Sequence, residues 1–121
     1  MELTPLVHPG HQIIERYGPS GFRVSGRVYL GPVLVFPDRT VEWQEAAMTE
    51  EGLAPVIAHG GVELLLLGLG RHMVPVAAAL RAALKACGIA IEAMDTGAAC
   101  RTYNVLLAED RRVAAALLPP L

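Results

Sequence analysis

A run of four leucines, Leu64-Leu65-Leu66-Leu67, is the feature of this sequence that most restricts its fold. Gly60-Gly61 precedes the run, and Gly68 and Gly70 close it, so the apolar stretch has the length of one strand. A continuous apolar strand suits a sheet that is covered on both faces. The sequence therefore predicts a buried strand over residues 63–68 in an α/β protein.

The chain after residue 48 alternates between helical and strand patterns. Thr49 is expected to cap a helix that continues through Ala58, with Glu50 and Glu51 in the first turn, where the helix dipole favours anions. After the leucine strand we expect a helix that begins at Pro75 and ends before Gly88, and then a strand over 89–94. A second helix follows, which Asp95 or Thr96 caps and which ends near Asp110. The last expected element is a strand over 112–118, although its alanines would equally suit a helix.

The first third of the chain has the pattern of short strands joined by tight turns. Glycine and proline pairs, at Gly18-Pro19 and Gly31-Pro32, separate stretches of strand-forming residues. The expected strands cover 12–17, 21–24, 27–30 and 33–36, with one more short strand over 39–43. This spacing indicates a meander of β-hairpins.

The order of these elements places a candidate site at one edge of a sheet. Alternating strands and helices favour a sheet with helices on both faces. Right-handed crossovers then bring the strand ends at Gly68 and Met94 side by side. Ligands of open α/β sheets usually bind at such carboxyl ends.

Length and composition exclude several classes of function. A chain of 121 residues fits one domain over 1–121, and its formal charge of −2 gives no basic surface for nucleic acid. No apolar stretch is long enough to span a bilayer, and no targeting segment is legible, so we expect a cytoplasmic protein. Cys87 and Cys100 lack the spacing of a metal site, and we expect no metal and no cofactor. The oligomeric state is left open.

Gly68-Leu69-Gly70 lies between a predicted strand and a predicted helix, as a dinucleotide-binding loop would. The fingerprint fails because Met73 stands where the third glycine is needed. A tight turn that requires small residues is the favoured interpretation. Arg71 and His72, which follow, keep an anion site open as an alternative.

The segment that starts at Asp95 offers the other half of the candidate site. Asp95 and Thr96 open a helix, whose free amides can hold an anion or be capped by the chain itself. Arg101, one turn inside, is either a solvated surface charge or the cationic wall of a small pocket. Cys100 is either a small buried thiol or a nucleophile activated by the helix end.

Several segments together resemble the Mth-like domain family, a family of unknown function. The resemblance extends over nearly the whole chain and is most specific at Ala98-Ala99-Cys100-Arg101-Thr102-Tyr103-Asn104. The other matching segments are 14–18, Phe22, Gly26, 29–31, Trp43, 66–70, 88–89, 94–96 and 113–118. The resemblance implies a three-layer α/β domain around a mixed sheet and no established enzymatic activity. For mitochondrial members it implies a role in assembling the respiratory NADH dehydrogenase together with a partner assembly protein.

Our leading hypothesis is a non-enzymatic module that binds proteins, with an assembly role of this kind. The candidate binding site is a pocket mouth formed by Gly68, Gly70, Arg71, Asp95, Thr96 and Arg101. The alternative is an enzyme that binds a small molecule or an anion and uses Cys100 or Asp95 with Arg101 at the same mouth.

Overall fold

The computed structural model describes residues 10–71 and 74–120. Its elements, in chain order, are β1 (Ile14–Gly18), β2 (Gly21–Val24), β3 (Arg27–Leu30), β4 (Val33–Val35), β5 (Thr40–Glu42), α1 (Ala54–His59), β6 (Leu64–Leu69), α2 (Ala78–Ala86), β7 (Ala90–Met94), α3 (Thr96–Ala108) and β8 (Val113–Leu118).

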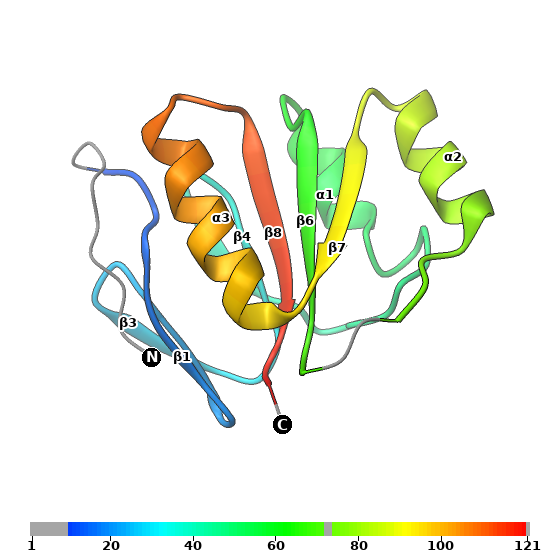
Figure 1. Ribbon diagram of the computed structural model, residues 1–121. Helices are drawn as coiled ribbons and strands as arrows, with labels where there is room; N and C mark the ends of the chain where they lie inside the picture. The colour runs from blue at the N-terminus through cyan, green and yellow to red at the C-terminus, as the bar shows by residue number, and fades with distance from the viewer. Residues whose placement is uncertain (1–9, 72–73, 121) are drawn as a thin grey trace.

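The strands form two sheets. The first is an antiparallel meander in the order β1-β2-β3, and the second has the order β5-β4-β8-β6-β7. In the second sheet β6 is parallel to both β7 and β8, whereas β4 is antiparallel to β8 and to β5, so the sheet is mixed. Figure 1 shows the five-stranded sheet near edge-on, with β6 and β8 at its middle.

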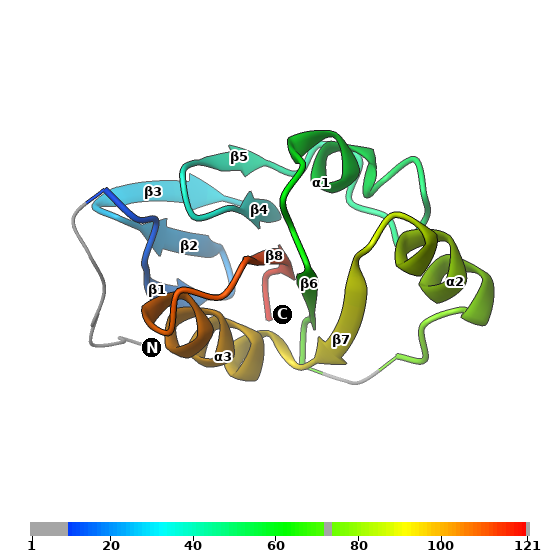
Figure 2. The same cartoon turned by 90° about the horizontal axis from the view of Figure 1, so that it is seen from above.

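The domain has three layers, and the five-stranded sheet is the middle one. One apolar cluster lies between the sheet and helices α1 and α2, and a second lies between the opposite face, α3 and the meander. Seen from above, α1 and α2 lie to one side of β6 and β7, and α3 lies to the other (Figure 2). The predicted α/β architecture, with helices on both faces and an N-terminal meander, is confirmed.

The leucine run forms β6, and its environment explains its composition. Leu65 and Leu67 pack in the cluster beneath α1 and α2, whereas Leu66 packs beneath α3 and the meander. A strand covered on both faces needs apolar side chains at successive positions. The same reason makes residues 113–118 a strand rather than a helix, because the three alanines of β8 are buried on alternate faces between β4 and β6.

The helix predicted from Thr49 is wrong over its first half. Helix α1 begins at Ala54, with Pro55 in its first turn and no side-chain cap. A helix that ran from Thr49 through Pro55 would lose a backbone hydrogen bond and place the proline ring against a carbonyl one turn earlier. The Thr49 hydroxyl instead accepts a hydrogen bond from the amide of Gly52 at 3.0 Å, which closes a turn before the helix.

The helix predicted from Pro75 also begins later than expected. Helix α2 starts at Ala78, and Pro75 lies in the non-helical segment before it, where the half-buried Val76 packs against the core. Leu80 and Leu84 form the buried face of α2, as their spacing predicts. Among the described residues, no helix is both long and apolar enough to cross a membrane.

Candidate functional site

The carboxyl ends of three parallel strands meet at one edge of the central sheet. Gly68 of β6 faces Met94 of β7, and Leu69 of β6 faces Leu118 of β8. The chain leaves β6 through Gly70 and enters α3 directly after β7. The predicted juxtaposition of the strand ends at Gly68 and Met94 is therefore present.

Thr96 joins three segments of the chain at this edge. Its hydroxyl donates a hydrogen bond to the carbonyl of Leu118 at 2.6 Å and accepts one from the amide of Gly70 at 2.8 Å. Its own amide donates to the carbonyl of Gly70 at 2.9 Å. Because Thr96 is completely buried, these bonds satisfy its own hydroxyl and amide, which water cannot reach. Thr96 therefore fixes the ends of β6 and β8 against the start of α3.

The two glycines of the β6 end have different structural requirements. A Cβ on Gly68 would lie 2.8 Å from Cδ2 of Leu117 on β8 and 3.2 Å from Cα of Thr96, so a side chain there would require Leu117 and the start of α3 to shift. Gly70 has a φ of +82°, which L side chains rarely adopt. Tight packing and a sharp turn account for both glycines, in line with the favoured interpretation.

Asp95 and Cys100 have local roles within α3. The carboxylate of Asp95 accepts a hydrogen bond from the amide of Ala98 at 2.9 Å and caps the helix, as its position predicts. Cys100 is completely buried, and burial raises the pKa of its thiol to about 12. Since the thiolate is the reactive form, this environment gives no support to Cys100 as a nucleophile.

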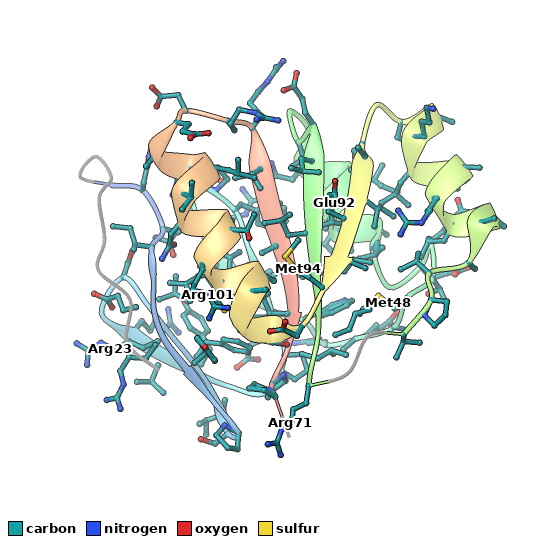
Figure 3. The ribbon with its side chains drawn as sticks, in the orientation of Figure 1. Arg23, Met48, Arg71, Glu92, Met94 and Arg101 are labelled. Atoms are coloured by element: carbon teal, nitrogen blue, oxygen red, sulfur yellow. The ribbon has the colours of Figure 1, made fainter. Side chains whose placement is uncertain are left out.

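Arg101 lies between α3 and the meander. Its guanidinium donates a hydrogen bond from Nη1 to the hydroxyl of Tyr17 on β1 at 3.1 Å. Gly97 makes room for this contact, because a Cβ there would lie 2.7 Å from the Tyr17 hydroxyl oxygen. Figure 3 shows Arg101 beside α3 on the side of the meander, and Arg71 apart from it at the end of the molecule near the C-terminus.

An open groove of about 620 Å³ lies at the same edge of the sheet. We name it the C-edge groove, since it follows the carboxyl ends of β6 and β8. Its lining residues are Pro19, Ser20, Gly31, Pro32, Leu69, Gly70, Arg71, Val74, Leu118 and Pro119. Apolar side chains and glycine or proline backbone predominate, and among the described residues of this lining Arg71 is the one charged side chain, whereas His72 lies outside the described residues.

Four of the six predicted site residues lie at the C-edge groove, and two do not. Gly70 and Arg71 line the C-edge groove, and Gly68 and Thr96 lie directly beneath it through the contacts with Gly70 and Leu117. Asp95 and Arg101 do not line the groove.

Sequence reasoning missed the other wall of the groove. That wall consists of Pro19-Ser20, the turn between β1 and β2, and Gly31-Pro32, the link from β3 of the meander to β4 of the central sheet. The glycine–proline pairs identify these segments as turns, but their place beside the end of β8 depends on how the two sheets pack.

A histidine and an aspartate form a second polar cluster at the opposite edge of the sheet. The His59 ring stacks on Phe36 with centroids 4.2 Å apart, and its Nε2 lies 2.7 Å from a carboxylate oxygen of Asp38. The hydrogen bond from His59 lowers the pKa of Asp38. In the described ranges, no group of three histidine, cysteine, aspartate or glutamate side chains is arranged to hold a metal ion.

Comparison with known proteins places this α/β fold in a family. The family described as "Protein of unknown function (DUF498/DUF598)" matches residues 14–118, and the chain belongs to it. A solved structure from Bordetella pertussis, described as a Mth938-like domain, superposes with a TM-score of 0.81 at 27% identity, over 99% of this chain and 93% of that one.

Two relatives illustrate the range of the family. An uncharacterized protein of Rhodobacter capsulatus is 41% identical over 107 residues, which are 88% of this chain and 83% of that protein. The NADH dehydrogenase (ubiquinone) 1 alpha subcomplex assembly factor 3 of Danio rerio is 34% identical over 112 residues, 89% of this chain and 64% of that protein. The chain thus spans less than two thirds of the length of this assembly factor, and 60% of the human one.

Proposed function

We propose that this protein is a non-enzymatic module that binds proteins and acts in the cytoplasm as an accessory factor in assembling a respiratory NADH dehydrogenase-type complex. The observation that carries the proposal is the similarity to assembly factor 3 over 89% of this chain. The buried, protonated Cys100 supports a binding role over a catalytic one.

The C-edge groove is the surface at which we propose that a partner binds. Its apolar lining suits side chains of a protein segment, and Arg71 on its wall suits a carboxylate or another small anion of that partner. Gly68 and Thr96 form the support beneath the groove, and Asp95 fixes the start of α3. Arg101 acts through Tyr17, by holding the meander that forms the other wall.

The experiment is affinity purification of the tagged chain from its native cells, with quantitative mass spectrometry of the NADH dehydrogenase subunits. We expect those subunits to be enriched over an untagged control. Val74→Glu in the groove and Arg71→Glu should each lower the enrichment about tenfold, as the loss of about 1.4 kcal/mol of binding would.

Val105→Glu is the matched control. Val105 is 57% exposed on α3, outside the groove, and Val74 is 56% exposed within it. The control variant should retain the full enrichment. If no NADH dehydrogenase subunit is enriched, or if the pure protein turns over a small molecule, the proposal is wrong.

A further inference from the structure

Strand β3 forms an edge of the meander whose backbone is open. Within residues 10–71 and 74–120, β3 pairs with β2 alone. The amide of Gly31 donates to the carbonyl of Ser20 on the β2 side at 3.0 Å. Because backbone groups alternate in direction along an antiparallel strand, Tyr29 also bonds toward β2, whereas Val28 and Leu30 direct their amides and carbonyls to the outer edge.

The same two residues expose apolar side chains. Val28 is 64% exposed and Leu30 is 73% exposed, whereas Tyr29 between them is 9% exposed and packs toward α3. Soluble proteins usually protect an edge strand with proline, an inward charge or a bulge, and the Val28-Tyr29-Leu30 segment carries none of these. Exposed apolar side chains beside open backbone groups are the arrangement that accepts an added strand.

The charge of the meander identifies the kind of strand that fits. Residues 14–30 contain Arg16, Arg23, Arg27 and one acid, Glu15, a net charge of +2, so the rest of the chain carries −4 to give the total of −2. Pairing of β3 with β3 of a second copy would place two positive meanders beside each other. An acidic partner is complementary instead, which favours association with it.

The outer face of the meander shows where an acidic side chain would lie. Arg16, Arg23 and Val28 face one another in register across the three strands. A hollow of about 260 Å³ is lined by all three of these residues. Glu15, the acid of this region, bonds to Nε of Arg23 and to the amide of Gly26. A glutamate placed beside Val28 on an added strand can enter the hollow toward the guanidinium groups.

We propose that the open edge of β3 binds an extended segment of an acidic partner protein as a fourth strand of the meander. The segment carries a carboxylate beside Val28 and an apolar side chain beside Leu30. This surface adjoins the C-edge groove at Ser20, but neither Arg71 nor Val74 lines the hollow, so variants of these two residues should leave strand addition unchanged.

The test uses the full chain, labelled with ¹⁵N, and a synthetic peptide of sequence Thr-Glu-Val-Leu-Val-Glu-Thr. On one face this peptide presents an apolar side chain flanked by carboxylates. We expect the peptide to shift the amide resonances of Val28 and Leu30 and to slow their hydrogen exchange. The same peptide with lysine in place of both glutamates should bind about tenfold more weakly or not at all.

A backbone variant separates strand addition from contact with side chains. Val28→Pro removes an amide that points to the open edge, and edge strands tolerate proline at such positions. It should weaken peptide binding about tenfold or more while β2 and β3 remain paired, whereas Val28→Thr, which keeps the amide, should bind within about threefold of wild type.

Three results would overturn the proposal. The first is that the acidic peptide leaves the β3 resonances unchanged or binds no more tightly than the lysine peptide. The second is full binding by a folded Val28→Pro variant. The third is exchange protection of Val28 and Leu30 in the chain alone. Protection that grows with concentration would assign the edge to a second copy, and protection independent of concentration would assign it to another part of the same chain.

Discussion

The hydroxyl of Thr96 lies 2.8 Å from the amide of Gly70, and this bond ties the start of α3 to the turn that leaves β6. The same hydroxyl donates to Leu118. Thr96→Val keeps the shape of the side chain but leaves the half-buried amide of Gly70 and the half-buried carbonyl of Leu118 without this hydrogen bond. We expect the free energy of unfolding in urea to fall by about 1–3 kcal/mol. Thr96→Ser, which keeps the hydroxyl, should lose less, and equal losses in the two variants would contradict this role.

The close approach of β6 to α3 predicts that Gly68→Ala is destabilising. Its Cβ would lie 2.8 Å from the side chain of Leu117 and 3.2 Å from the backbone of Thr96. Overpacking of this kind costs about 1–3 kcal/mol, which thermal or urea unfolding can measure. Gly18→Ala is the control, because nothing lies within 4 Å of a Cβ there and Gly18 has no positive φ. A Gly68→Ala protein as stable as the control would show that α3 can move away freely.

The contact between Arg101 and Tyr17 predicts a modest coupling energy. The bond is at the surface, where solvent competes for both groups, so a double-mutant cycle of Arg101→Ala and Tyr17→Phe should give about 0.5–1 kcal/mol. Arg101→Ala should also weaken partner binding through the meander wall, without loss of the overall fold. If Arg101→Ala causes a large loss of stability but each folded molecule still binds the partner fully, Arg101 has only a structural role.

Features that depend on neighbours in the chain were predictable from the sequence. The Leu64-Leu65-Leu66-Leu67 strand follows from burial on both faces, and the Asp95 cap follows from helix chemistry. The helix predicted from Thr49 failed because the break imposed by Pro55 outweighs the capping signal of Thr49.

The candidate site was less predictable, because its contacts join distant parts of the chain. Thr96 meets Gly70 and Leu118, which are 26 and 22 residues away. Nothing in the local sequence indicates that Tyr17 on β1 accepts a hydrogen bond from Arg101, 84 residues away. Only the packing of the meander on α3 creates that contact.

The environments of the two cysteines predict very different reactivities. Cys87 is exposed and Cys100 is buried with a pKa of about 12. A thiol reagent such as DTNB at pH 8 should therefore modify Cys87 in the native protein and both thiols after denaturation. In a Cys87→Ser variant the native protein should be inert. Rapid modification of Cys100 below pH 8 in that variant would instead support the alternative of an enzyme that uses Cys100.

The pair of Asp38 and His59 predicts a pH dependence of stability on the acid side. The hydrogen bond from His59 lowers the pKa of Asp38 below its ordinary value of 3.8, so the folded state binds this proton less tightly than the unfolded state. The contribution of Asp38 is therefore fully present above pH 3.8 and is lost as the pH falls through the lower, folded-state pKa.

The comparison that measures this contribution is the difference in unfolding free energy between wild type and Asp38→Asn. Because the Asp38 side chain is 58% exposed, solvent screens the pair, and the difference at pH 7 should not exceed about 1 kcal/mol. It should shrink toward zero as the pH falls below 3.8. A direct NMR titration of the Asp38 carboxyl should give a midpoint below 3.8, and a midpoint above that value would show that His59 does not hold the carboxylate in solution.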